Sequence, residues 1–272
     1  MSTARISPTA HATGFVWHRN GLSHPVLRTA PGAALYPFVA IADRVSAAIG
    51  GPTLEDTLLA RHRLIDERLD SAIAAGRIGQ VVEIAAGLSP RGLRVSERHG
   101  DAGVTYLEGD LPAMAARKRA LLARAGGAAT HRVVELDALA ETGPRSLAAI
   151  CREHLDAARG TAIVVEGLYS YFDRDAVSAM WQRAAAALAA FPHGLFLCDL
   201  YLEDEWDHVV GVRGFFAVLG VFARGRVHFQ FADAAEAEAA ARAAGFASAA
   251  LLCPEPHHAR RPGPVRILEA TL

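Results

Sequence analysis

The sequence has little cysteine and no excess of charge of either sign. Three cysteines, Cys151, Cys198 and Cys253, stand far apart, which is too few for a disulfide framework and lacks the paired spacing of a zinc site. Each lies beside apolar residues, so we expect three buried free thiols in a reducing compartment. With 28 basic and 29 acidic residues, the chain lacks the positive field of a nucleic-acid binder. We therefore expect no nucleic acid partner.

Long apolar runs are missing as well. Residues 1–14 contain no continuous apolar stretch of the kind that marks a secretory signal. The most apolar later segment, Gly214–Ala223, has ten residues, which is too short to cross a bilayer. We expect a cytoplasmic protein without a membrane partner. Since 51% of the 272 residues are hydrophobic and 21% are charged, the composition is that of a globular protein with a sizeable core.

The chain begins with a long N-terminal segment that carries turn signals at Pro25, Pro31-Gly32 and Pro37. A first helix is predicted after Thr53, which can cap it, and apolar residues then recur at helical spacing as far as Gly76. From there short apolar runs alternate with helical stretches. The apolar runs are Gln80–Ala85, Val104–Glu108, His131–Leu136, Thr161–Glu166 and Leu195–Asp199.

Runs this short and apolar suit strands that are buried on both faces of a parallel sheet. Two last extended segments, Ala247–Cys253 and Val265–Leu272, are joined by a Pro-Gly turn and should pair as a hairpin. We expect an α/β fold with a doubly wound, mostly parallel sheet and an antiparallel C-terminal hairpin. Residues 1–52 would form an N-terminal helical extension and residues 53–272 the ligand-binding domain, with a lid at about 201–228.

Ligands of such sheets bind outside the carboxyl ends of the strands. Gly87 follows the first strand, and Glu108 lies 21 residues further on, close to the offset at which nucleoside-binding folds place a ribose-binding carboxylate. The alternative interpretation is a tight turn and a solvated acid. Positions 85, 87 and 90 are Ala, Gly and Pro, so the G-x-G-x-x-G fingerprint of dinucleotide binding is absent. This favours S-adenosylmethionine and leaves an NAD(P)-dependent oxidoreductase as the alternative.

Acids close the next strands too. Glu108 and Asp110 share one face of an extended chain, so we expect Glu108 to accept the ribose hydroxyls and Asp110 to cap the following helix. Asp137 ends the third strand, where it could face an adenine amino group. Glu166 ends the fourth strand before Gly167 and two tyrosines, an arrangement that suits a carboxylate facing a cleft. A capping acid followed by core tyrosines is the alternative.

These residues resemble the leucine carboxyl methyltransferase family, which includes polyketide O-methyltransferases of the tetracenomycin type. The similarity covers roughly residues 55–200. It runs in order through Arg61, Gln80–Arg91, Glu108–Pro112 with the later Lys118, and Glu166–Phe172. The resemblance implies a class I S-adenosylmethionine-dependent O-methyltransferase with a seven-stranded sheet and a small-molecule acceptor.

The resemblance also implies roles for single residues. In the cofactor site Arg61 would pair with the carboxylate of S-adenosylmethionine, Gly87 would line its methionine part, and Glu108 or Asp110 would hold the ribose. Asp137 would meet the adenine, and Glu166 would lie near the amino group. Glu83 and Ala85 are also expected to bind the cofactor. Two positions depart from the family pattern: Ala85 replaces the first glycine of a G-x-G, and Ser89 replaces an aspartate. These departures leave a non-catalytic cofactor-binding protein as a third hypothesis.

Methyl transfer requires the lone pair of the acceptor in line with the leaving sulfur. A carboxylate is already ionised at pH 7 and needs positioning but no general base, whereas a phenol or alcohol would need one. We therefore name no catalytic residue. Candidates for the acceptor pocket are Tyr169, Tyr171, Tyr201, Trp206 and Arg213. Arg213 could anchor an acidic acceptor or lie on a solvated helix face, and a homodimer is left open.

Two basic clusters receive no role. Lys118-Arg119 is interpreted as a solvated helix face. His257-His258 is interpreted as an exposed basic turn and not as a metal site, because no acid or cysteine stands at ligand spacing.

Overall fold

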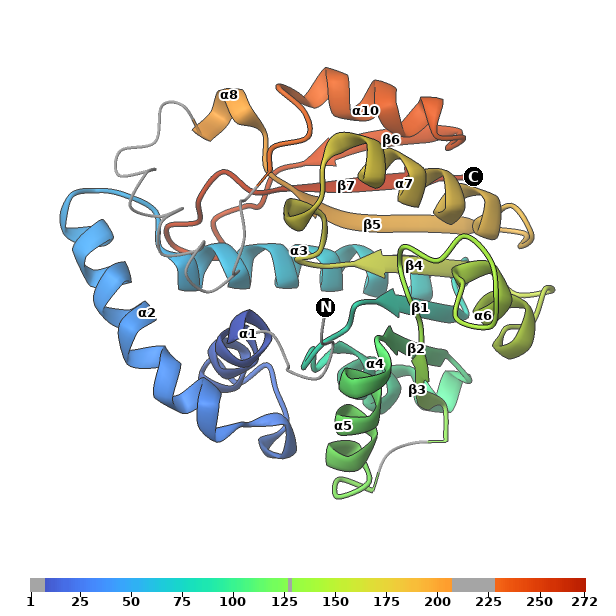
Figure 1. The fold of residues 1–272 in the computed structure, drawn as a ribbon, viewed down its shortest axis with the longest axis horizontal. Coiled ribbons are helices and arrows are strands. Elements are labelled where there is room, and N and C mark those ends of the chain that lie inside the picture. Colours follow the sequence, from blue (N-terminus) through green and yellow to red (C-terminus); the bar gives the residue numbers. More distant parts are fainter. Residues whose placement is uncertain (1–7, 127–128, 207–227) are drawn as a thin grey trace.

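The computed structural model describes residues 8–126, 129–206 and 228–272 (Figure 1). At its centre lies one sheet made of β1 (Gln80–Ile84), β2 (Thr105–Asp110), β3 (His131–Glu135), β4 (Thr161–Val165), β5 (Gly194–Leu200), β6 (Ser248–Leu252) and β7 (Arg266–Thr271). The seven strands have the order β3-β2-β1-β4-β5-β7-β6. Strands β1 to β5 are parallel, and β7 runs antiparallel to both β5 and β6. The predicted α/β fold and its C-terminal hairpin are confirmed.

Helices cover both faces of this sheet (Figure 1). On one face pack α3 (Leu54–Ala74) and α4 (Arg91–His99), and on the other α6 (Leu147–His154), α7 (Arg174–Leu188) and α10 (Ala234–Ala243). All residues of β1, β4 and β5 are buried. Burial on both faces is the reason why these strands are continuous apolar runs in the sequence.

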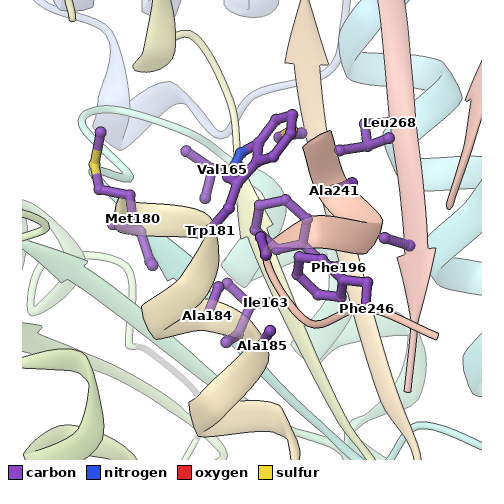
Figure 2. Packing of buried hydrophobic residues seen from close by; sticks show 14 of the residues in the cluster. Ile163, Val165, Met180, Trp181, Ala184, Ala185, Phe196, Ala241, Phe246 and Leu268 are labelled. Atoms are coloured by element: carbon purple, nitrogen blue, oxygen red, sulfur yellow. The ribbon is translucent and has the colours of Figure 1, made fainter. Parts of the chain in front are cut away.

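The face under α7 and α10 holds the largest core cluster (Figure 2). Trp181 of α7 meets Phe196 of β5 edge to face, with 6.4 Å between ring centroids. Phe196 in turn stacks on Phe246 at 5.1 Å. Such aromatic pairs add to the burial of apolar area and fix α7 and the segment that follows α10 against the centre of the sheet.

Two of the three thiols belong to this core. Cys151 and Cys198 are buried, as predicted, whereas Cys253 is exposed. The prediction is wrong for Cys253 because β6, which ends at Leu252, is the edge strand of the sheet. The chain leaves the protein core at that point.

The N-terminal residues form two helices, α1 (Pro8–Arg19) and α2 (Ala30–Ala48), which contact each other and α3 (Figure 1). The predicted cap Thr53 is confirmed at the start of α3. The turns predicted at Pro31-Gly32 and Pro37 are wrong, because both sites lie inside α2. Thr29 caps this helix, and Pro31 stands in its first turn, where the missing N–H of proline costs little.

Helix α5 (Pro112–Leu122) follows β2. The remaining elements are short, namely η1 (Pro25–Leu27), η2 (Gly100–Ala102), η3 (Tyr169–Tyr171) and α8 (Glu203–Trp206). Most of the predicted lid, residues 207–227 with Arg213, lies outside the described residues. None of the helices in the described parts of the chain is both long and apolar enough to cross a membrane.

Candidate active site

A cavity of about 310 Å³ lies where β1, β2 and β4 end. The strand order reverses between β1 and β4, and doubly wound sheets bind ligands at this point. The lining residues are Thr9, Ala10, Thr13 and Trp17 of α1; Arg61 of α3; Glu83 and residues 85–89 around the end of β1; Asp110, Leu111, Ala113 and Met114 after β2; and Glu166, Gly167, Leu168 and Tyr171 after β4.

The loop of residues 85–89 makes a sharp turn between β1 and α4. Both Ala85 and Gly87 have a left-handed backbone, with φ of 54° and 52°. The amide of Gly87 donates a hydrogen bond of 2.7 Å to Oδ2 of Asp110. The carbonyl of Ser89 accepts a hydrogen bond of 2.8 Å from Nζ of Lys118. The loop is thus held in the middle from β2 and at its end from α5.

Asp110 is the acid of β2 that reaches the cavity. Its second oxygen, Oδ1, accepts the amide of Leu111 at 2.8 Å, and burial raises the pKa of Asp110. The prediction that Asp110 caps the next helix is wrong, because Leu111 occupies the capping position of α5 without a side-chain hydrogen bond.

Glu108 does not face the cavity, which corrects the prediction that it holds the ribose. Its carboxylate is buried between Nζ of Lys118 at 2.5 Å and Nε2 of His131 at 3.1 Å. Glu108 lies two residues before the end of β2, about 6.6 Å inside the sheet, whereas ligands bind beyond the strand ends. Lys118 is only 1% exposed, so its assignment to a solvated helix face is wrong as well.

At the α3 side of the cavity Arg61 meets Glu166. Nε of Arg61 donates to Oε1 of Glu166 at 3.0 Å, and Nη1 donates to Oδ2 of Asp199 at 3.1 Å and to the hydroxyl of Tyr201 at 3.3 Å. A Cβ atom on Gly167 would come within 2.8 Å of Nη2 of Arg61. A glycine at this position lets the guanidinium lie against the backbone after β4.

A second guanidinium, that of Arg91, is fully buried beside this pair. It donates to Oε1 of Glu83, Oδ1 of Asp66 and Oε2 of Glu166, each at 2.6 Å. Glu83 also accepts the hydroxyl of Tyr106 at 2.9 Å. The carboxylates of Glu83 and Glu166 are therefore both occupied by Arg91, and Glu166 joins the two arginines.

His62 completes the group around Glu166. Its Nδ1 lies 2.8 Å from Oε2 of Glu166, and its ring packs on Trp17 of α1 with 4.7 Å between centroids. Burial would raise the pKa of Glu166, but the charges of His62, Arg91 and Arg61 outweigh it and lower this pKa well below its usual range. Glu166 stays ionised in the folded protein.

Sequence reasoning missed several of these groups. Asp199 ends an apolar strand in the same way as Glu166, so the same signal could have identified it. His62 stands next to Arg61 on α3, and Asp66 follows one turn later, a helical spacing that also places them together. The residues of α1 carry no such signal, since only tertiary packing brings this helix over the cavity.

Some predicted residues are not among the residues that line the cavity. Tyr169 is buried in the core, with its ring 6.2 Å from that of Trp181, which corrects its assignment to the acceptor pocket. Trp206 is also a buried residue and donates its indole N–H to the carbonyl of Pro264. Its assignment to the acceptor pocket stays a prediction, because the segment that follows it lies outside the described residues. The hydroxyl of Tyr201 accepts a hydrogen bond from Arg61. The carboxylate of Asp137 accepts the amide of Leu139 in the loop after β3.

The structure brings together the remaining predicted residues. Arg61, Glu83, Ala85, Gly87, Asp110, Glu166 and Tyr171 all line the one cavity described above. Their contacts with a cofactor or an acceptor stay predictions.

The turn at His257-His258 meets an acid after all. Oε2 of Glu67 on α3 lies 3.1 Å and 3.0 Å from the Nε2 atoms of the two histidines, and His258 is buried. Nδ1 of His258 accepts the amide of Glu255 at 2.9 Å, so Nε2 is the ring nitrogen that faces Glu67. Glu67, His257 and His258 each offer one ligand atom, and these atoms lie within 4.8 Å of one another. The premise that no acid stands near this turn is therefore wrong, and the absence of a metal stays a prediction.

The sheet order and the antiparallel last strands give the chain the fold of class I methyltransferases. A protein from Thermobifida fusca YX assigned to the methyltransferases has the same fold, with a TM-score of 0.62 at 14% identity over 99% of this chain and 95% of its own. A DUF574 family protein from Streptomyces avermitilis has a TM-score of 0.61 at 15% identity, covering 97% and 95% of the two chains.

Residues 33–185, more than half of the chain, match the family of leucine carboxyl methyltransferases, and the chain belongs to this family. Two similar proteins bear the name of S-adenosyl-L-methionine-dependent methyltransferases. One, from Mycobacterium avium (strain 104), is 38% identical over 48% of this chain and 40% of its own length. The other, from Mycolicibacterium vanbaalenii, is 36% identical over 54% and 44%. The chain thus spans less than half the length of these relatives.

Proposed function

We propose that this protein transfers a methyl group from S-adenosylmethionine to a carboxylate oxygen of a small, polyketide-like molecule. Membership of the leucine carboxyl methyltransferase family supports the methyl transfer, and so do the names of its relatives. The fold is shared with a magnesium protoporphyrin IX methyltransferase from Synechocystis PCC 6803 that contains S-adenosylhomocysteine, with a TM-score of 0.50 and 15% identity over 80% of this chain and 85% of the other.

The residues of the cavity fit the parts of this cofactor. Asp110 offers a carboxylate to the ribose hydroxyls, and Arg61 and Glu166 offer opposite charges to the carboxylate and ammonium of the methionine part. The backbone of residues 85–89 lies between them. The described lining contains one arginine and three carboxylates, an acidic balance that suits a cationic sulfonium. When bound, the cofactor supplies an activated methyl group with a neutral thioether as leaving group.

The acceptor class rests on the titratable groups of the cavity. No histidine, lysine or cysteine is among the described lining residues. The carboxylates of Glu83 and Glu166 are held by arginines, and that of Asp110 by two amides. Glu83 and Glu166 are thus engaged by cations, and Asp110 is assigned to the ribose in this proposal, so we assign no general base among the described lining residues. An acceptor that arrives ionised needs only positioning, and a carboxylate does so at pH 7.

We propose that residues 8–52, the described part of the N-terminal extension, form an arm that closes the acceptor end of the cavity. Thr9, Thr13 and Trp17 of α1 belong to the lining. A nicotinamide cofactor is the weaker choice, because its pyrophosphate would require the missing glycines at positions 85 and 90.

Calorimetry tests the cofactor. We expect S-adenosylmethionine and S-adenosylhomocysteine to bind and NAD not to bind, and Asp110→Ala to weaken binding by tenfold or more. Binding of NAD alone would overturn the proposal.

Methyl transfer from labelled cofactor to a panel of carboxylates, phenols and alcohols tests the acceptor. With a carboxylate the rate should stay level between pH 6 and 9. With a phenol it would rise about tenfold per pH unit below the phenol pKa of about 10. Labelling of phenols alone, with that slope, would contradict a carboxylate acceptor.

A further inference from the structure

A second ion network lies directly beneath the loop of residues 85–89. Lys118 of α5 and Glu108 of β2 are both about 1% exposed in their side chains, with Nζ and Oε2 2.5 Å apart. Nε2 of His131, the first residue of β3, lies 3.1 Å from Oε1 of Glu108. None of these three residues lines the cavity. The network touches the loop at one atom, the carbonyl oxygen of Ser89, which accepts a hydrogen bond from Lys118 at 2.8 Å.

We propose that Lys118 is a positioning residue: anchored by Glu108, it holds the carbonyl of Ser89 and so keeps the loop of residues 85–89 in the shape that receives the cofactor. The inference rests on the proposed function, because it names how the cofactor site is kept open. Lys118 itself makes no contact with the cofactor in this proposal.

The loop needs such a hold because its backbone is unfavourable without one. Ala85 is left-handed, a conformation that costs free energy for any residue with a Cβ atom. Asp110 binds the middle of the loop at the amide of Gly87. After the loop, Arg91 is fixed by its carboxylate partners. The hydrogen bond from Lys118 to the carbonyl of Ser89 fixes the part of the chain that lies between Gly87 and Arg91.

The ion pair of Lys118 and Glu108 does more than fill space in the core. Burial alone would raise the pKa of Glu108, but the charge of Lys118 and the contact with His131 lower it. An ionised Glu108 keeps the ammonium of Lys118 in place, and a charged donor binds a carbonyl more strongly than a neutral one. An apolar side chain of equal length would fill the space at lower desolvation cost, yet it would leave Ser89 without its donor.

The first turn of α4 rests on the same network. A Cβ atom on Gly92 would clash with Oε1 of Glu108 and with Nε2 of His131. The network therefore also determines where the backbone runs after the loop. Ser89 and Gly92 are three residues apart in the sequence, and the network lies close to both.

The test compares Lys118→Met, which keeps the length of the side chain, with Lys118→Arg, which keeps the charge. Arg119→Met on the same helix is the matched control, because Arg119 is exposed and its polar partners among the described residues, the carbonyl of Val133 and the carboxylate of Glu135, lie on β3. Two quantities are measured: the dissociation constant of S-adenosylhomocysteine by calorimetry, and hydrogen exchange of the amides of residues 85–89 in the protein without ligand.

We expect Lys118→Met to weaken binding at least tenfold and to speed exchange in the loop. Lys118→Arg should stay within threefold of the wild type, and Arg119→Met should match it. Glu108→Gln weakens the ion pair that holds Lys118 but leaves the ammonium of Lys118 as donor to Ser89. Its dissociation constant and its loop exchange should lie between those of the two Lys118 variants. This variant decides the question if Lys118→Met does not fold.

Failure of the proposed function and failure of the positioning role of Lys118 would give different results. A wild-type protein that binds neither S-adenosylmethionine nor S-adenosylhomocysteine refutes the proposed function. A wild type that binds, together with a Lys118→Met variant of equal affinity and unchanged loop exchange, refutes the positioning role. Ile150→Ala, in the core between α6 and the sheet, controls for stability. If it loses as much affinity as Lys118→Met at an equal drop in melting temperature, the role of Lys118 is structural only and the inference falls.

Discussion

Ala85 and Gly87, separated by one residue, have nearly the same left-handed backbone, with φ of 54° and 52°. For glycine this conformation is free of steric cost. For alanine it costs about 1–2 kcal/mol. The resemblance to the leucine carboxyl methyltransferase family predicts glycine at this position, and Ala85 adopts the left-handed backbone at the expense of local strain.

Replacement of Ala85 by glycine should relieve that strain. We expect Ala85→Gly to raise the free energy of unfolding by about 0.5–1 kcal/mol, since the relief exceeds the entropy that a glycine adds to the unfolded chain. Urea denaturation measures the change. The control is Ala86→Gly, whose φ is not positive and which should lose about 0.5–1 kcal/mol. Equal losses in both variants would show that Ala85 is not strained.

The strands and the acids at their ends could be predicted from the sequence because both signals are local. A strand buried on both faces is a short apolar run, as in Thr161–Val165. The carboxyl ends of parallel strands meet at one edge of the sheet, so the pattern of apolar runs is enough to place Asp110 and Glu166 together. The pattern does not decide which of two neighbouring acids, Glu108 or Asp110, reaches the cavity.

Contacts between distant elements were not predictable in this way. Nothing near Thr13 or Trp17 indicates that α1 lies over the strand ends. Lys118 was misinterpreted because its neighbour Arg119 is basic, although Met114, Ala115 and Leu122 share its buried helix face. This spacing of three and four residues was the available sign that Lys118 points inward.

Glu166 should contribute strongly to stability at neutral pH. Its carboxylate joins Arg61 and Arg91, and removal of one partner from a buried ion pair costs about 3–5 kcal/mol. We expect Glu166→Gln to lose about 3 kcal/mol at pH 7, because glutamine keeps one acceptor oxygen. Denaturation in urea gives this value, and the exposed Glu97→Gln controls for the change in charge.

The same variant should change the dependence of stability on pH. The folded pKa of Glu166 is lowered from 4.5, so its contribution is complete above about pH 4.5 and is lost as the pH falls toward the folded value. The gap between wild type and Glu166→Gln should therefore narrow by about 1.4 kcal/mol per pH unit below 4.5. Burial raises the pKa values of Asp110 and Asp199. Their contributions to stability therefore change with pH in the opposite direction to that of Glu166, in the wild type as well as in Glu166→Gln. A constant gap between pH 6 and 3.5 would contradict an ionised Glu166.

Gly92 should not tolerate a side chain. A Cβ atom there would clash with the carboxylate of Glu108 and the ring of His131. We expect Gly92→Ala to lower the free energy of unfolding by about 1–3 kcal/mol, the cost of an overpacked core, in spite of the better helix propensity of alanine. Gly100→Ala is the control, since its Cβ atom would meet nothing closer than Oγ1 of Thr130 at 3.7 Å. Thermal unfolding of both variants checks the prediction, and a stabilised Gly92→Ala would refute it.

Tyr171 and Tyr169 stand two residues apart on η3 and should differ in function. Tyr171 lines the cavity, whereas Tyr169 is buried against Trp181. We expect Tyr171→Phe to raise the KM of the acceptor about three- to tenfold, the effect of one lost hydrogen bond of about 0.5–1.5 kcal/mol. The affinity for S-adenosylhomocysteine should not change. Tyr169→Phe should leave both constants at their wild-type values, because Tyr169 is buried in the core and is not among the residues that line the cavity. Steady-state kinetics and calorimetry on the pair decide the matter: a Tyr171→Phe variant that loses cofactor affinity with an unchanged acceptor KM would move Tyr171 to the cofactor side of the cavity.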